Sequence, residues 1–309
     1  TGSAQASITL DSVNPSAGTV VLDGGASLTT STSVTLSLSG EDGTGTSIKD
    51  YRVTGDVASP TGWLASLPSP IELDGTLGDR TVIVSVRDQA DNEGSASATI
   101  TFDNAVPSAG TVLLDGGAGY TGDTSVTLAL SGADGTGSDI TDYRVTGDIS
   151  SPTGWVTSLP SPVTLTGGEG NPSTVTVEVR DEAGYEGSAS ATITVDTLSP
   201  SAGTVLLDGG AGYTADTSVT LALSGADGTG SSITHYRITG DIASPTGWVA
   251  TLPGSVTING GHGNGSTVTV EVRDQAGRTG SAQASITLDT VHPSAGTVVL
   301  DGGASLTTS

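Results

Sequence analysis

A repeat of about 93 residues runs through the whole chain and decides what it can fold into. The core Pro-Ser-Ala-Gly-Thr-Val begins at Pro15, Pro107, Pro200 and Pro293, at spacings of 92, 93 and 93 residues. The Thr-Gly-Trp and Tyr-Arg motifs recur with the same period. A fixed period of this size is the mark of a repeat architecture in which each repeat is one structural unit. The sequence therefore predicts a tandem array.

The period divides the chain into three whole modules and two partial ones. In order, we expect residues 1–10 to be the last strand of a preceding module, 11–103, 104–196 and 197–289 to be the three whole modules, and 290–309 to open a following module. Residues 1–31 and 279–309 differ at only two positions. A longer polymer with a three-module unit, of which this chain is a window, explains that identity most simply.

Alternation of apolar and polar residues predicts short β-strands within each module. In the first module the pattern places strands at 18–22, 33–39, 48–54, 81–87 and 95–102, with shorter irregular ones between. No segment shows helical periodicity. About seven short strands, with turn signals roughly every 8–12 residues, are typical of an immunoglobulin-like sandwich. The expected fold class is all-β, with tandem immunoglobulin-like β-sandwich modules arranged end to end.

Composition excludes several classes of function. The net charge is −24, with only nine Lys and Arg residues, which argues against nucleic-acid or anionic-membrane binding because both need basic surface. The chain has no run of apolar residues of membrane-spanning length and no signal peptide. It also lacks Cys and Met, the two readily oxidised residue types, which suits an exposed extracellular protein.

The order of motifs resembles a known family. The run PSAGTVLLDGG, followed by TSVTLALSGADGTG, DYRVTGD, STVTVEVRDEAG and ATITVD, is similar to the bacterial Ig-like repeats of large surface proteins and adhesins. The resemblance implies a stalk or fibre at the bacterial cell surface, and some family members hold Ca²⁺ at their domain junctions. The Asn that usually ends the family's Asp-x-Ala-Gly-Asn element is Tyr185 and Arg278 here, and the first module reads Asp-Gln-Ala-Asp-Asn from Asp88 to Asn92.

Aspartates gather at the predicted joints between modules. In an Ig-like sandwich, the linker and the loops after the second and sixth strands lie at the same pole, so we expect each joint to collect three carboxylates. Ca²⁺ takes six to eight oxygen ligands, mostly carboxylate and carbonyl. The candidate Ca²⁺ ligands are Asp11, Asp42 and Asp88 at the first joint, Asp103, Asp134 and Asp181 at the second, and Asp196, Asp227 and Asp274 at the third. The opposite poles add Asp23, Asp56, Asp115 and Asp148.

Turn chemistry is the alternative explanation for these aspartates. Asp before Gly is a common turn residue, and charged residues at strand ends discourage edge-to-edge aggregation. Repulsion between carboxylates crowded at a joint favours the metal, because a cation or protons must compensate it. Both interpretations stay open on the sequence alone.

Other residues that recur in each repeat indicate structural roles. One Trp per module, beside Pro and Gly, favours a packing residue over a sugar-stacking platform. The Arg of each Tyr-Arg pair is expected to face outward and to pair with a carboxylate. Catalysis finds no support, because the histidines at positions 235, 262 and 292 are not repeated and no nucleophile motif occurs. The protein is not expected to be an enzyme.

These observations predict a structural array, the shaft of an extracellular bacterial surface fibre or adhesin, with Ca²⁺ stiffening the joints. Its expected partners are neighbouring modules of the same polymer, with lateral self-association as a further possibility, and its expected location is the bacterial cell surface. Each module should extend on the order of 35–45 Å at about 3.3 Å per strand residue. The alternatives are a fibre subunit completed by strand exchange between chains, a module that binds carbohydrate or a host protein, and a spacer in a large extracellular enzyme.

Overall fold

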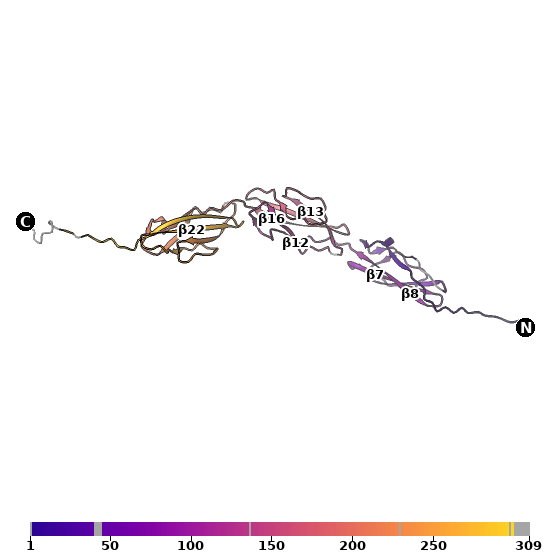
Figure 1. Ribbon diagram of the computed structural model, residues 1–309. Helices are drawn as coiled ribbons and strands as arrows, with labels where there is room; N and C mark the ends of the chain where they lie inside the picture. Colours follow the sequence, from indigo (N-terminus) through magenta and orange to yellow (C-terminus); the bar gives the residue numbers. More distant parts are fainter. Residues whose placement is uncertain (1, 40–44, 136, 229, 297, 300–309) are drawn as a thin grey trace, which may run out of the picture. The chain divides into compact units, whose positions relative to one another are not determined.

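The computed structural model describes residues 2–39, 45–135, 137–228, 230–296 and 298–299, and its fold is all-β (Figure 1). The only other regular elements among these residues are two short 3₁₀ turns, so no helix in the described ranges could cross a membrane. The chain divides into two compact units, one of residues 1–118, 125–166 and 173–192, the other of residues 119–124, 167–172 and 193–309. The module boundaries drawn from the repeat stay a prediction.

The strands recur in three sets of the same order. The first set is β1 (Thr19–Leu22), β2 (Leu28–Thr29), β3 (Ser33–Val34), β4 (Leu36–Ser39), β5 (Ile48–Gly55), β6 (Ile71–Glu72), β7 (Gly78–Asp88) and β8 (Glu93–Phe102), with η1 (Asp23–Gly25) after β1. The second is β9 (Thr111–Leu114), β10 (Tyr120–Thr121), β11 (Ser125–Val126), β12 (Leu128–Ser131), β13 (Ile140–Gly147), β14 (Val163–Thr164), β15 (Pro172–Asp181) and β16 (Glu186–Val195). The third is β17 (Thr204–Leu207), η2 (Asp208–Gly210), β18 (Tyr213–Thr214), β19 (Ser218–Ser224), β20 (Ile233–Gly240), β21 (Ser255–Thr257), β22 (Gly265–Asp274) and β23 (Thr279–Leu288).

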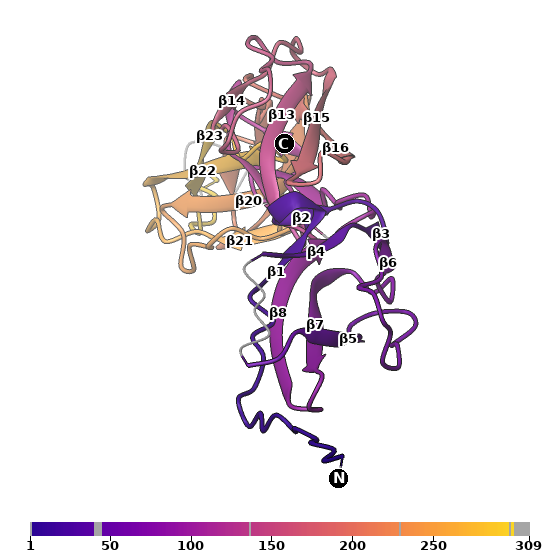
Figure 2. The same ribbon diagram turned by 90° about the vertical axis from the view of Figure 1, so that its right-hand side faces the viewer.

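Each set builds one four-stranded sheet, in the orders β2-β8-β7-β5, β10-β16-β15-β13 and β18-β23-β22-β20. The short first strand of each sheet runs parallel to its neighbour, as β2 does to β8, whereas β5, β7 and β8 pair antiparallel (Figure 2). The remaining strands form the opposing layer, as the separate pairs β1-β4 and β3-β6 in the first set, the pairs β9-β12 and β11-β14 in the second, and the three-stranded sheet β17-β19-β21 in the third. This arrangement is the two-layered sandwich expected from the sequence.

A thin aliphatic core fills each sandwich. Successive side chains of a strand point to opposite faces, so Val82 and Val84 on β7 and Ile100 and Phe102 on β8 are fully or almost fully buried. They pack with residues of β1, β3, β4 and β5 in one cluster, and an equivalent aliphatic cluster occupies the third set of strands. Burying one such side chain is worth about 1.5–3 kcal/mol, which lets a sequence poor in aromatic residues hold a sandwich.

One glycine in each set of strands allows the backbone of the joint to pack closely against the sandwich. A Cβ built on Gly94, Gly187 or Gly280 would overlap the carbonyl oxygen of the proline that opens the same set, at Pro15, Pro107 or Pro200. Only a residue without a side chain lets these backbones meet. The repeated glycine at the start of β8, β16 and β23 therefore fixes where the chain enters each sandwich.

The five strands expected in the first module are confirmed, with one difference of detail. The segment expected at 33–39 is broken at Thr35 into β3 and β4, whereas β19 in the third set is continuous. Residues 2–10 form no strand, although positions 1–10 are identical in sequence to β23. In β23, Ile286 and Leu288 are buried between paired strands, while Ile8 and Leu10 are 99% and 92% exposed. Strand formation depends on a neighbouring strand, which residues 2–10 lack in this chain.

Candidate functional site

The joint aspartates are held by the backbone around them. The amides of Asp103, Asp196 and Asp289 donate to the carbonyl oxygens of Thr29, Thr121 and Thr214, at 2.8–3.0 Å. The carboxylates in turn accept the amides two residues further on, as Asp103 does from Ala105 at 2.9 Å. Asp103 and Asp196 are completely buried. These joints are therefore ordered parts of the fold, and the carboxylates of Asp103 and Asp196 face inward, whereas Asp289 is exposed.

In the first unit, Asp103 lies beside Asp181. Asp103 accepts a hydrogen bond from the Ser138 hydroxyl and lies so close to Gly137 that a Cβ there would overlap its carboxylate. Asp181 ends β15, is 2% exposed, and accepts the Tyr185 amide at 2.8 Å through Oδ1. Its Oδ2 is buried without a hydrogen-bond donor among the described residues. Burial raises the pKa of Asp181, and the negative charge of Asp103 adds to the rise.

The second unit repeats the arrangement with Asp196 and Asp274. Oδ2 of each is buried without a donor among the described residues. Burial, reinforced by the charge of Asp196, raises the pKa of Asp274. Glu169 approaches the same place, since a Cβ on Gly230 would overlap both Glu169 and Asp196. Hydrogen bonds from the hydroxyl and the amide of Thr197 lower the pKa of Glu169. Sequence analysis missed Glu169, because its position varies between repeats.

At the first joint, the side-chain amide of Asn92 satisfies the buried carboxylate oxygen. Asn92 Nδ2 donates to Asp88 Oδ2 at 3.0 Å and to the Asp11 carbonyl oxygen at 3.3 Å. Asp88 is completely buried and also accepts the amides of Ala90 and Asn92. Burial alone would raise its pKa, but these hydrogen bonds outweigh it, so the pKa of Asp88 is lowered. The atom that lacks a donor in Asp181 and Asp274 is thus satisfied in Asp88.

The remaining predicted ligands do not join these pairs. Asp134 and Asp227 are exposed, and their backbones form bridges with Ser108 and Ser201. Asp42 lies outside the described residues. Within the described ranges, no group of three or more Asp, Glu, His or Cys side chains is placed to hold a metal ion. At the second and third joints a pair of buried aspartates therefore stands where three were expected, whereas at the first joint Asp88 is buried and Asp11 is half-buried.

Aspartates at the opposite poles serve turns. Asp23, Asp115 and Asp208 each accept a backbone amide twelve residues further on, at 2.7–2.8 Å. They adopt positive φ angles of 41–45°, the left-handed region that Asp tolerates better than most residues. Asp56, Asp148 and Asp241 cap the strand that follows through the amides of Thr81, Thr174 and Thr267. These side chains have the turn role that the alternative explanation assigns.

An open hollow lies beside the Asp103–Asp181 pair in the first unit. It has a volume of about 380 Å³ and is lined by Asp79, Asp139 and Glu182, together with Thr101, Ser138 and two glycines. Thr101 donates to Asp79 at 2.7 Å. Three acidic side chains therefore border the solvent next to two buried ones, which makes this the most strongly acidic hollow described.

Each Trp lies between two arginines. The guanidinium carbons of Arg52 and Arg87 lie 4.7 and 4.6 Å from the centroid of Trp63. Arg144 and Arg180 flank Trp155, and Arg237 and Arg273 flank Trp248, at 4.6–5.0 Å. The expected pairing of the Tyr-Arg arginines is confirmed, since Arg144 binds Glu178 and Arg237 binds Glu271 through two nitrogens each. The Trp residues thus pack under cations.

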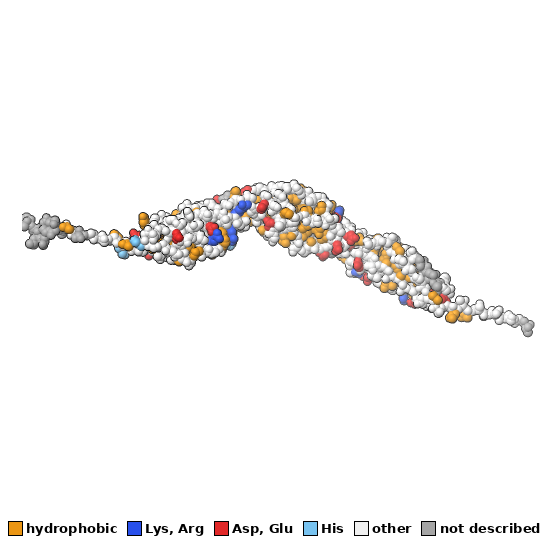
Figure 3. Space-filling view, viewed as in Figure 1, with side chains coloured by type: hydrophobic (Ala, Val, Ile, Leu, Met, Phe, Trp, Pro, Cys, Tyr) orange, Lys and Arg blue, Asp and Glu red, His pale blue; other side chains and the backbone are white. Residues whose placement is uncertain are grey.

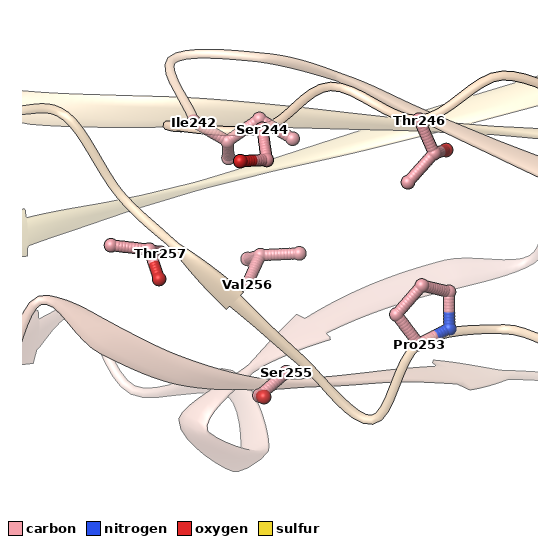
Figure 4. A pocket seen from close by; sticks show the side chains of 7 residues that line it. All are labelled: Ile242, Ser244, Thr246, Pro253, Ser255, Val256 and Thr257. Carbon is pink, nitrogen blue, oxygen red and sulfur yellow. The ribbon is translucent and has the colours of Figure 1, made fainter.

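A second small hollow recurs in every set of strands. In the third set it is lined by Ile242, Ser244, Thr246, Pro253, Ser255, Val256 and Thr257, with a volume of about 180 Å³ (Figure 4). The equivalent hollows measure about 260 and 300 Å³. The Thr246 hydroxyl accepts the Ile238 amide at 2.9 Å, and Thr61 and Thr153 do the same for Val53 and Val145. These hydroxyls therefore hold the loop against the neighbouring strand.

Basic side chains are rare on the surface. On the face shown in Figure 3, Lys and Arg form only a few small groups among neutral and acidic residues. The described arginines are largely those of the Trp stacks. Cationic surface in this protein is therefore concentrated at the Arg–Trp–Arg stacks.

Comparison with known proteins finds distantly similar solved structures and no family. No protein-family model and no curated protein matches the chain. Among solved structures, the Escherichia coli adhesin FdeC is 15% identical, with a TM-score of 0.45, over 90% of this chain and 99% of its own. The fibronectin(III)-like modules of Clostridium thermocellum CbhA are 12% identical, with a TM-score of 0.38, over 60% and 100%. A 1.5-MDa bacterial ice-binding adhesin is 18% identical, with a TM-score of 0.31, over 83% and 89%.

Proposed function

We propose that the chain is a structural array, part of the shaft of an extracellular bacterial surface fibre or adhesin. The observation that carries the proposal is the structure of the joint between modules, which recurs once in each repeat of about 93 residues. The joints at Asp103 and Asp196 are short, contain a proline, and bury an aspartate whose amide donates to the adjoining sandwich and whose carboxylate accepts an amide of the joint itself. Joints built this way resist bending, as a spacer that transmits force requires.

We further propose that Ca²⁺ binds at two of the joints. The buried Oδ2 atoms of Asp181, Asp196 and Asp274 support this, because a buried carboxylate oxygen without a donor costs about 1–3 kcal/mol or more unless a cation is present. Asp103 with Asp181, and Asp196 with Asp274 and Glu169, would hold the ion, with carbonyl oxygens or water completing its shell. The ion would supply the positive charge that each carboxylate pair lacks. The Asn92 amide already fills this role at the first joint.

Scattering and melting together test both parts of the proposal. We expect the full chain to behave as an extended particle in small-angle X-ray scattering. In Ca²⁺ we expect its maximum dimension and its thermal midpoint to exceed those in excess chelator. Unchanged values on chelation would reject the metal and leave the joints stiffened by their hydrogen bonds alone. A compact particle in both solutions would reject the shaft itself.

The matched control is Mg²⁺ at the same concentration. Mg²⁺ demands a smaller, near-octahedral shell and gives up its water reluctantly. We expect it to replace Ca²⁺ poorly at a site built from buried carboxylates and backbone. Equal effects of the two ions would indicate general screening of the −24 net charge.

A further inference from the structure

When the repeats are aligned, the three Arg–Trp–Arg stacks differ in the residue that lies opposite the second arginine. In the first stack, Arg87 pairs across the strands with Asp50, and its Nη2 lies 2.6 Å from Asp50 Oδ2. In the second, Arg180 pairs with Asp142, and the same two atoms lie 2.9 Å apart. In the third, the residue opposite Arg273 is His235. An imidazole therefore stands where a carboxylate stands in the other two.

The other side of Arg273 has changed as well. On the strand that follows, Arg87 faces Glu93, and the charges of Asp50, Asp91 and Glu93 all favour its protonated form. Arg273 faces Thr279 in the same register. The contact recorded for its guanidinium is the stack on Trp248 at 4.7 Å, and among the described residues no carboxylate pairs with it. Arg273 thus has no acidic residue opposite it on either adjacent strand, whereas Arg87 has one on each.

The side chains around Arg273 are nevertheless ordered. The Arg273 guanidinium stacks on the Trp248 ring, and Arg237, which stacks on the same ring, pairs with Glu271. The Thr234 hydroxyl donates its single proton to the carbonyl of Arg273 or Asp274, at 3.2 and 3.3 Å. His235 Nδ1 lies 3.0 Å from that hydroxyl and is hydrogen-bonded to it. Both His235 and Arg273 are half-buried, so solvent reaches the place between them.

We propose that Arg273, oriented by Trp248 and flanked by His235, is a binding site for a carboxylate from outside the module. The first two stacks show which group fits, because a carboxylate of this chain already occupies the equivalent position there. Arg presents its N–H groups in a planar fork that matches a carboxylate. The carboxylate is supplied either by a free acid or by a second copy of this chain, whose net charge is −24.

Side-chain NMR of the full chain tests this site against its own internal controls. With ¹⁵N-labelled protein, acetate is added in exchange for chloride at constant ionic strength, and the Arg Nε–Hε resonances are followed. The expected result is a saturating shift of the Arg273 resonance, with those of Arg87 and Arg180 unmoved because their sites are filled. Equal or merely linear shifts of all three would overturn the proposal.

Variants separate binding from a change in fold. His235→Asp should supply the missing carboxylate and abolish the acetate-dependent shift, whereas His235→Asn should leave Arg273 unpaired and keep it. Loss of the shift in both variants, or its survival in His235→Asp, would refute the site. In the reverse direction, Asp142→His should make the Arg180 resonance respond to acetate as Arg273 does.

Dilution identifies the source of the carboxylate. If a second copy supplies it, the Arg273 resonance in acetate-free buffer should move toward its free position as protein concentration falls, and His235→Asp should remove that dependence. A resonance that is constant on dilution but saturates with acetate assigns the site to a free acid. A resonance that responds to neither contradicts the proposal.

Discussion

The side-chain amide of Asn92 lies 3.0 Å from Oδ2 of Asp88 and satisfies a buried carboxylate oxygen. At the two equivalent positions Tyr185 and Arg278 donate only their backbone amides, to Asp181 and Asp274. The Arg278 side chain turns away and donates to the Gly122 carbonyl oxygen. One residue in each loop thus decides whether the joint is satisfied by the protein itself or is left with an unpaired negative charge.

Replacing Asp181 by Asn should therefore stabilise the metal-free protein. Asn keeps an acceptor for the Tyr185 amide and removes the buried negative charge, whose Oδ2 has no hydrogen-bond donor among the described residues. We expect the free energy of unfolding in chelator to rise by about 1 kcal/mol, measured by urea denaturation. In Ca²⁺ the same variant should gain less stability from the ion than the parent does.

Asp227→Asn is the control for that experiment. Asp227 was predicted as the equivalent ligand of the third joint, but it is exposed. Its substitution should change neither the stability in chelator nor the response to Ca²⁺. If Asp227→Asn and Asp181→Asn behaved alike, the buried pair would not be the feature that matters.

The ion pair between Arg237 and Glu271 should make stability depend on pH. The hydrogen bond from Arg237 lowers the pKa of Glu271 against a smaller effect of burial. A carboxyl whose pKa is lower in the folded state contributes stability above its unfolded pKa and loses it as pH falls through the folded pKa. Glu271→Gln should cost about 0.5–1 kcal/mol at pH 7. The difference from the parent should shrink toward zero in urea titrations carried out at successively lower pH.

The Trp stacks should show measurable coupling. Trp155→Leu removes the ring between Arg144 and Arg180 while keeping an apolar side chain. We expect a loss of about 1–2 kcal/mol, because each cation–π contact at a partly exposed site is worth about 0.5–1 kcal/mol. A double-mutant cycle with Arg180→Leu isolates the contact, and a coupling energy near zero would mean that the Trp contributes only buried area. Tyr213→Leu, at a side chain 72% exposed, should be almost neutral.

Much of the fold follows from the sequence, because its causes are local. Alternation with period two predicted the strands, and the repeat showed that one sandwich recurs. The carboxylate pairs followed in part, since the topology brings Asp103 and Asp181 to one pole. The Trp stacks could not be predicted from the sequence, because they depend on the cross-strand register that places Arg87 opposite Asp50. The lack of a donor at Asp181 also depends on side-chain directions that turn motifs do not specify.

The glycine at the start of each last strand gives the sharpest test of how the joints are seated. In Gly187→Ala the new Cβ would overlap the carbonyl oxygen of Pro107, and both partners are backbone atoms that cannot rotate away. We expect a destabilisation of about 2–3 kcal/mol, measured by urea denaturation. Gly154→Ala is the matched control within the same repeat, because nothing lies within 4 Å of its Cβ position. If the two variants unfolded at the same urea concentration, the proline carbonyl would not be seated against β16, and the joint would be looser than its hydrogen bonds indicate.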